Sequence, residues 1–277
     1  MRTPNVTVVV LNWNGWKDTL QCLNSLQQLS APKPQILLID NHSTDGSVAH
    51  IRQAHPDLEI LETPSNLGFG GGCNVGIRHA MDRGADYVWL INSDATVEPY
   101  TLSAMVRLAE GQPAVGAVGS VIFELAAPDR VELWGGGWVN LWLGRSKPRM
   151  APAPLAFVSG ASMLLRARAL EQTGLFDAQR FFMYWEDTDL GFRLRQQGWQ
   201  LATAADSRVW HRGSGSLGKG NPTADAYFVC SAVRFFRRHA PWPFLASAAL
   251  VGSLLAKRLL LGQWPRVRAV LRGLRAA

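Results

Sequence analysis

The sequence predicts an α/β fold in which a doubly wound, mostly parallel sheet is flanked by helices and followed by a C-terminal helical extension. Short apolar runs alternate with helix-like stretches through the first 95 residues, which favours parallel strands joined by crossover helices. Each run ends in polar residues. The 277 residues, 47% of them hydrophobic, are enough for a large core and exclude a disordered chain.

The expected elements follow in chain order. Continuous apolar runs predict strands buried on both faces at residues 6–11, 36–40, 58–61 and 87–91. Helices are predicted at residues 16–28, 47–55 and 73–83, the last after a glycine-rich turn at 66–72. In the less regular second half, strands are predicted at 115–123, 134–143 and 200–204, and a strand pair or bend at 157–165. The other expected elements are helices at 167–173 and 187–197, a loop at 126–130 and a flexible connector at 145–154.

Charge is distributed unevenly along the chain. Residues 1–206 hold 16 Lys and Arg against 20 Asp and Glu, whereas residues 207–277 hold 12 against one acid, Asp225. This asymmetry predicts a partner with phosphate charge. No nucleic-acid-binding motif accompanies the basic segment, so no nucleic acid is expected. Three scattered cysteines and an N-terminus without a signal-peptide pattern predict a cytoplasmic location.

Polar residues that follow three predicted strands are expected to meet at one edge of the sheet. These residues are Asn12, Trp13 and Asn14, then Asp40 and Asn41, and finally Asn92, Ser93 and Asp94. Ligands of open α/β sheets bind beyond the carboxyl ends of the strands, so a nucleotide is expected there. Asp94 is suited to hold Mg²⁺ or Mn²⁺ against a diphosphate. An ordinary turn is the alternative, because Asn, Ser and Asp favour turns.

A second candidate site is the acidic helix start that runs from Trp185 to Asp189. Its three carboxylates within four residues exceed what the helix dipole needs. Because like charges raise the pKa of a carboxyl group, Asp187 or a neighbour is a candidate general base. Stabilisation of the helix start alone is the competing interpretation, chiefly for Glu186 and Asp189.

His211 and the glycine-rich segment 66–72 are weaker candidates. His211 ends a predicted strand before a Gly/Ser-rich stretch, and it is either a metal or phosphate ligand or a structural histidine. The glycine-rich segment lacks the third glycine of the dinucleotide fingerprint, where Cys73 stands, and the chain has no P-loop. A close backbone approach to a ligand, or a plain turn, is expected there.

The order and spacing of these pieces resemble the family-2 inverting glycosyltransferases of the GT-A fold. The likeness is greatest to the rhamnosyltransferase-type members that build bacterial surface polysaccharides. The segments that carry it are residues 6–15, 37–47, 66–77, 89–99, 160–199 and 209–216. We therefore expect a catalytic domain at 1–220, with a nucleotide-binding half at 1–98 and an acceptor half at 99–220, and a basic helical tail at 221–277.

The resemblance implies roles in donor binding. The nucleotide-binding residues would be Leu11, Trp13, Asp40, Ser93 and Asp94. Leu11 and Trp13 would line the base pocket, and Asp40 would hydrogen-bond the pyrimidine. Asp94 matches the last aspartate of the family's DxD-type metal motif, whose first acidic position is Asn92 here, and His211 matches a further metal ligand of some relatives.

The resemblance also implies the reaction, a non-processive inverting transfer from a nucleoside-diphosphate sugar to a hydroxyl of a glycan or lipid-linked acceptor. The donor would be dTDP-rhamnose first and a UDP-linked hexose next. Asp187 matches the catalytic base, and Trp185 and Glu186 are expected to contact the acceptor. The alternatives are a sugar nucleotidyltransferase and a catalytically inactive sugar-binding or scaffold protein. Against them, residues 12–16 lack the basic side chains of a triphosphate-binding loop, and the acidic cluster is retained.

The C-terminal tail carries its own prediction. Residues 240–256 form an uncharged run of 17 residues between basic pairs, at the lower limit for a membrane-spanning helix. Residues 266–275 alternate arginines with apolar residues, which is typical of helices that lie on a membrane surface. We expect peripheral attachment to an anionic surface on the cytoplasmic face of the inner membrane. The alternative is packing on the catalytic domain or on a second copy, as a homodimer.

Overall fold

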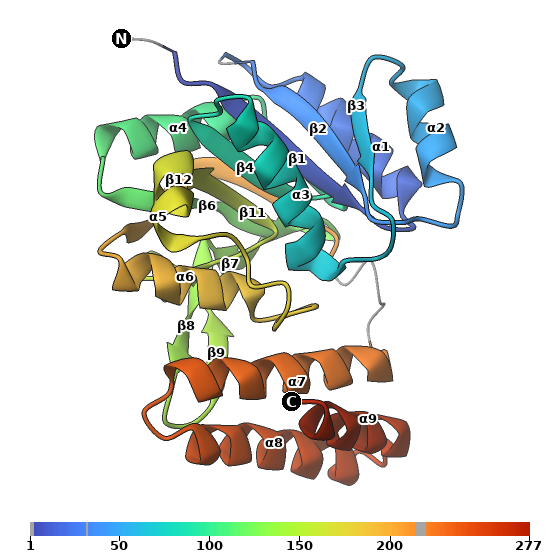
Figure 1. The fold of residues 1–277 in the computed structure, drawn as a ribbon, viewed down its shortest axis with the longest axis vertical. Coiled ribbons are helices and arrows are strands. Elements are labelled where there is room, and N and C mark those ends of the chain that lie inside the picture. Colours follow the sequence, from blue (N-terminus) through green and yellow to red (C-terminus); the bar gives the residue numbers. More distant parts are fainter. Residues whose placement is uncertain (1–2, 32, 214–219) are drawn as a thin grey trace.

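A nine-stranded sheet lies at the centre of the computed structural model, which describes residues 3–31, 33–213 and 220–277 (Figure 1). Within these residues the strand order is β3-β2-β1-β4-β11-β6-β12-β5, with β7 paired to β6. Helices cover the sheet, and three more helices form a separate layer below it in Figure 1. The predicted α/β class with a helical extension is confirmed.

The N-terminal half is a parallel sheet with crossover helices, as predicted. Its strands are β1 (Val6–Asn12), β2 (Gln35–Asp40), β3 (Glu59–Glu62) and β4 (Tyr87–Asn92). Its helices are α1 (Trp16–Gln27), α2 (Ser47–Ala54) and α3 (Gly68–Asp82). The register pairs Asn12 with Asp40 and Leu11 with Asn92. The polar ends of these strands therefore meet at one edge.

Helix α3 begins at Gly68, five residues earlier than the sequence suggests, because the glycines let the helix pack closely on its neighbours. A Cβ added at Gly72 would lie 2.4 Å from a methyl carbon of Leu11, and one at Gly68 would lie 2.1 Å from the carbonyl oxygen of Phe182. The predicted turn at 66–72 is thus mostly helix. The glycines of this segment come closest to Leu11 of β1 and to Phe182.

The second half of the sheet is mixed. Strands β5 (Ala95–Val97), β6 (Val115–Glu124), β7 (Ala127–Trp134), β11 (Ser162–Arg166) and β12 (Gln200–His211) complete the large sheet. Strands β8 (Gly136–Asn140), β9 (Arg145–Pro148) and β10 (Phe157–Val158) form a small one. Strand β11 runs antiparallel to β4 and β6, whereas β12 runs parallel to β6. The helices of this half are α4 (Thr101–Gly111), α5 (Ala167–Thr173) and α6 (Glu186–Gln196).

Three local predictions for this half are wrong. The expected loop at 126–130 is mostly strand β7, and the expected connector at 145–154 begins with strand β9. The expected strand at 134–143 is divided at Gly135, which has a positive φ of 75°. In each case pairing with a neighbouring strand, such as Phe123 with Val131, decides the structure. The apolar pattern of one segment does not show which strand it will pair with.

Helices α7 (Pro222–His239), α8 (Pro243–Leu260) and α9 (Trp264–Arg275) form the C-terminal layer. A buried ion-pair network joins α7 to α6: Asp189 accepts hydrogen bonds from Arg193 at 2.7 Å and from His239 at 2.8 Å. Asp189 therefore has a structural role. Of the described helices, α8 alone has the length and apolar character to cross a membrane, with a mean hydropathy of 1.4, and 17% of it is buried.

Candidate active site

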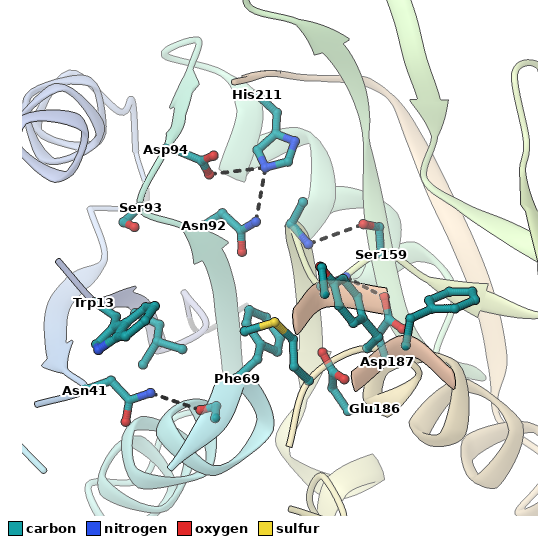
Figure 2. Close-up of a pocket in the computed structure, with 18 of the residues that line it drawn as sticks. Trp13, Asn41, Phe69, Asn92, Ser93, Asp94, Ser159, Glu186, Asp187 and His211 are labelled. Carbon is teal, nitrogen blue, oxygen red and sulfur yellow. Dashed lines mark hydrogen bonds and ion pairs between the residues drawn. The ribbon is translucent and has the colours of Figure 1, made fainter. Parts of the chain in front are cut away.

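A cavity of about 620 Å³ opens at the carboxyl ends of β1 and β4. Leu11, Trp13, Ser93 and Asp94 lie in its wall on the side of the parallel strands. Glu186 and Asp187, at the start of α6, lie in the wall across from Trp13 (Figure 2). Asp94 and Asp187, which are 93 positions apart in the sequence, are thus brought to one cavity.

Asn41, one of the strand-end residues expected at this edge, and Asn66, which was given no role of its own, support the Trp13 side of the cavity. Asn41 donates from Nδ2 to Asn66 Oδ1 at 3.0 Å and to the Gly68 carbonyl at 3.1 Å, and its Oδ1 accepts from the Leu67 amide at 3.0 Å. Both asparagines line the cavity. Their position at a strand end and before a glycine-rich helix start was the available signal.

Asp40, expected to contact the pyrimidine, lies outside the cavity wall and is 2% exposed. One of its carboxylate oxygens accepts from Asn12 Nδ2 at 2.7 Å and the other from the Ser43 amide at 2.9 Å. Asn12 in turn accepts from the Thr19 hydroxyl at 2.8 Å. In this structure Asp40 therefore holds together the loops on either side of Trp13.

Asp94 and His211 meet at the upper side of the cavity in Figure 2. His211 Nε2 lies 3.2 Å from Asp94 Oδ1 and 3.1 Å from Asn92 Nδ2, and its Nδ1 lies 3.2 Å from Glu132 Oε2. Burial opposes the charged form of the imidazole, but the hydrogen bonds to Asp94 and Glu132 outweigh it and raise the pKa of His211 to about 9. Burial likewise opposes ionisation of Asp94, yet His211 lowers its pKa below the usual range.

Asp94 and His211 are suited to be two ligands of a divalent cation whose other ligands come from a bound substrate. Among the described residues no group of three or more His, Cys, Asp or Glu side chains is arranged to hold a metal ion. Mg²⁺ typically uses only one or two carboxylates, with phosphate oxygens and water completing its coordination. Asp94 and His211, 3.2 Å apart, are close to the roughly 3 Å expected between neighbouring ligands of such an ion. Residues 214–216 of the Gly/Ser-rich stretch lie outside the described residues.

Three hydrogen-bond donors favour the ionised form of Asp187. Its Oδ2 accepts from the Gly160 amide at 3.1 Å, and its Oδ1 accepts from the Thr188 amide at 2.6 Å and the Thr188 hydroxyl at 3.2 Å. Burial raises the pKa of Asp187, and these hydrogen bonds partly offset that effect. A Cβ at Gly160 would lie 2.9 Å from the Phe69 ring, so glycine is needed for the amide to come this close.

Glu186 is the member of this pair whose ionisation is opposed more strongly. Burial, and then the charge of Asp187, raise the pKa of Glu186 well above its usual range. Its Oε2 is buried and has no hydrogen-bond partner among the described residues. Because Asp187 has the donors and Glu186 does not, a negative charge on the pair is favoured on Asp187, and the Glu186 carboxyl is left to donate or accept within the cavity.

The backbone before this pair is strained. Tyr184 and Trp185 have positive φ values of 68° and 67°, which cost non-glycine residues about 1–3 kcal/mol each. Trp185 is 4% exposed and packs against Phe235 and Phe236 of α7 at centroid distances of 4.8 and 5.2 Å. Trp185, expected to touch the acceptor, is therefore outside the cavity wall. Its burial holds the turn that presents Asp187.

The fold and the two acidic sites together define a glycosyltransferase of the GT-A type. The family model described as "Glycosyl transferase family 2" matches residues 7–174. The chain therefore belongs to this family. Over 268 residues it is 30% identical to an N-acetylglucosaminyl-diphospho-decaprenol L-rhamnosyltransferase of Mycobacterium tuberculosis, covering 87% of both chains. It is 24% identical to the galactofuranosyltransferase GlfT1 of the same organism, over 76% of this chain and 70% of that one.

A solved structure shows the same fold over nearly the whole chain. The mannosyltransferase PcManGT from Pyrobaculum calidifontis, in complex with GDP-Man and Mn²⁺, matches with a TM-score of 0.64 at 20% identity, covering 99% of this chain and 87% of that one. The family resemblance, the fold class and the enzymatic nature predicted from the sequence are confirmed. The nucleotidyltransferase and inactive-scaffold alternatives are set aside.

The proton on Glu186 predicts a pH-dependent effect of Glu186→Gln. Because the folded state raises the pKa of this carboxyl, its contribution to stability is fully present below the unfolded value of about 4.3 and is lost as the pH rises through the folded value. Glutamine has no such dependence. We expect the melting temperature of Glu186→Gln minus that of the wild type to grow as the pH rises from 5. Glu171→Gln, on the exposed side of α5, should show no such trend, and a gap independent of pH would contradict the protonation of Glu186.

Proposed function

We propose that this protein is a non-processive inverting glycosyltransferase that moves rhamnose from dTDP-rhamnose to a hydroxyl of a lipid-linked glycan acceptor. The observation that carries the proposal is that Asp94 and Asp187 line one cavity from different walls. An inverting transfer needs this arrangement, because the base and the leaving diphosphate act on opposite faces of the sugar. A UDP-linked hexose is the second candidate donor.

The donor is proposed to lie along the parallel-strand wall. Trp13 and Leu11 would contact the base, with Ser93 beside the diphosphate, and Asp40 would act by holding the loops around Trp13. Asp94 and His211 would hold a divalent cation, Mg²⁺ or Mn²⁺. Such an ion, when bound, supplies Lewis-acid stabilisation of the departing diphosphate. The Mn²⁺ in the PcManGT complex supports the presence of a cation.

Asp187 is proposed as the general base. Its carboxylate would take the proton of the acceptor hydroxyl as that oxygen forms a bond to the anomeric carbon. The bond from this carbon to the donor diphosphate breaks in the same step, and the nucleoside diphosphate leaves with the electron pair. The amides of Gly160 and Thr188 keep the carboxylate oriented, and neutral Glu186 beside it would hydrogen-bond the acceptor sugar.

The identities of the donor and the acceptor rest on similarity. The relative from Mycobacterium tuberculosis is named as a rhamnosyltransferase whose acceptor joins a sugar to a lipid through a diphosphate, and it matches this chain over 87% of its length. The basic charge of residues 207–277 supports a phosphate-bearing acceptor here as well. With such an acceptor, the reaction we propose would belong to the assembly of a cell-envelope polysaccharide.

We also propose that the protein attaches peripherally to the cytoplasmic face of the inner membrane. Exposed apolar side chains gather on α8, at its two ends and on the β8–β9 turn; we call this set the apolar tail surface. Its members are Trp142, Leu143, Trp242, Phe244, Leu245, Leu259, Leu260, Leu261 and Trp264. Lys257 of α8 and Arg268 and Arg272 of α9 are exposed and would favour anionic lipid by about 1 kcal/mol each where they reach its surface. Because α8 also packs on α7 through Ala246 and Leu250, we favour a helix that lies on the bilayer over one that spans it.

Replacing the base tests the mechanism. Asp187→Asn removes the proton acceptor but keeps the shape of the side chain, so we expect kcat to fall by about 10²–10⁴-fold. Binding of dTDP, measured by calorimetry, should change by less than about twofold, because donor contacts lie on the other wall. Asp206→Asn, an exposed position on β12, is the matched control and should leave kcat unchanged. Wild-type turnover in Asp187→Asn would remove this residue from the role.

Vesicle binding tests the membrane proposal. Phe244 and Leu260 are 86% and 88% exposed, so the double change Phe244→Asp, Leu260→Asp should leave folding and activity on a water-soluble acceptor unchanged. Its binding to phosphatidylglycerol vesicles should fall at least about tenfold. Tyr100→Asp, a large exposed residue far from the tail in sequence, is the control. Unchanged vesicle binding would contradict the proposal, and a dimer in light scattering that the double change dissociates would favour a second copy as the occupant.

A further inference from the structure

The C-terminal helices supply one wall of the active-site cavity. Ala224, Asp225 and Phe228 of α7 and Arg266 of α9 line the same space as Asp94 and Asp187. The transfer step described above uses none of these four residues. This wall is therefore available to recognise a part of a substrate other than the reacting sugar.

The charged groups of this wall are held in a fixed arrangement. Asp225, 8% exposed, accepts from Arg266 Nε and Nη2 at 2.7 Å each, and from Arg258 Nη2 at 3.2 Å. Two guanidinium groups thus share one carboxylate, and the cluster has a net positive charge. The bidentate pair orients Arg266 and occupies two of its five N–H groups. Within the described part of the chain its hydrogen bonds go to Asp225 alone, and the group remains one-fifth exposed.

This positive charge lies next to the turn that carries the acidic pair. Tyr184, which also lines the cavity, contacts Phe228 of α7 at a ring-centroid distance of 5.9 Å, and Phe228 is three residues after Asp225 on the same helix. The Asp94 side has a separate arginine, Arg212, whose guanidinium is paired with Asp18 at 2.9 Å. We therefore assign Arg266 to the incoming acceptor and not to the donor diphosphate.

The apolar tail surface and this wall meet in the chain at the junction of α8 and α9. Leu259 and Leu260, at the end of α8, are 47% and 88% exposed, Leu261 is 58% exposed, and Trp264, which begins α9, is 61% exposed. Arg258, one residue before Leu259, and Arg266, two residues after Trp264, both hydrogen-bond Asp225 in the cavity wall. The junction thus joins exposed apolar side chains to fixed guanidinium groups, as a lipid-diphosphate-linked sugar joins an apolar chain to a diphosphate.

We propose that Arg266, held in place by Asp225, binds the diphosphate of a polyprenyl-diphosphate-linked acceptor and so selects acceptors of this class. The inference rests on the proposed function for the direction of transfer. It adds the acceptor diphosphate subsite and assigns it to the C-terminal helices. Arg258 adds charge to the subsite through the shared carboxylate, and the lipid chain leaves the cavity past Trp264.

Two acceptors with the same sugar test the assignment in detergent solution, one an alkyl diphosphate ester and one a neutral alkyl glycoside. For Arg266→Ala we expect the KM of the diphosphate acceptor to rise about 10- to 100-fold, as loss of a charge-assisted contact predicts. The KM of the neutral acceptor and of the donor should stay within about twofold. Arg275→Ala, an exposed arginine at the end of the same helix, is the matched control and should change neither. Equal increases for both acceptors, or an increased donor KM, would overturn the assignment.

A binding measurement separates this inference from the proposed function. Calorimetry with farnesyl diphosphate, and with inorganic pyrophosphate for comparison, needs no turnover and no donor. We expect farnesyl diphosphate to bind the wild type at least about tenfold more tightly than Arg266→Ala. Equal affinities would refute the subsite even if rhamnosyl transfer is found. Arg266-dependent binding in a protein that turns over no sugar nucleotide would support the subsite and refute the proposed function. If Arg266→Ala does not fold, Arg266→Gln removes the charge and keeps a donor for Asp225.

Discussion

The packing of α7 against the segment Phe181–Trp185 is the constraint on which the active site depends. Two successive residues, Tyr184 and Trp185, adopt left-handed backbone conformations immediately before the acidic pair. The aromatic cluster around Phe235 and Phe236 and the hydrogen bond from the Ser231 hydroxyl to the Met183 carbonyl offset that strain. The C-terminal helices therefore shape the cavity, because they hold the turn that directs Asp187, the proposed base, into it.

The hydrogen-bond donors near each carboxyl group decide the electrostatics of the cavity. The ion pair with His211 favours the ionised form of Asp94, and two backbone amides favour the ionised form of Asp187. Glu186 has an unpartnered oxygen, and burial raises its pKa well above the usual range. Burial alone would favour the neutral form of all three groups. The arrangement of donors thus gives different ionisation tendencies to three carboxyls that are alike in sequence, as the proposed base, cation ligand and neutral hydrogen-bonding group require.

The sequence predicted the parallel half of the fold well and the rest less well. Apolar runs and helical periodicity are local, so β1 to β4, α1 and α2 were found close to their actual bounds, whereas α3 begins five residues earlier than expected. The β7–β9 region depends on the pairing of successive strands and on the turn at Gly135, which the apolar pattern of one segment does not encode. In the site, the motif residues at strand ends and at the α6 start were found, whereas Glu132, Asn66 and Arg266 reach the site only through tertiary contacts. For Asp225 the sequence offered one indication of a special role: it is the single acidic residue of the basic segment 207–277.

The central claim is that Asp94 holds the donor diphosphate in the cavity that Asp187 faces from the acceptor side. The most direct test is a crystal structure of the protein with dTDP and Mn²⁺, with the manganese located by anomalous scattering. We expect the ion about 2.1 Å from a carboxylate oxygen of Asp94 and from oxygens of the diphosphate, with the base against Trp13 and Asp187 free of metal. Manganese bound at Asp187 and Glu186, or a nucleotide outside this cavity, would contradict the account.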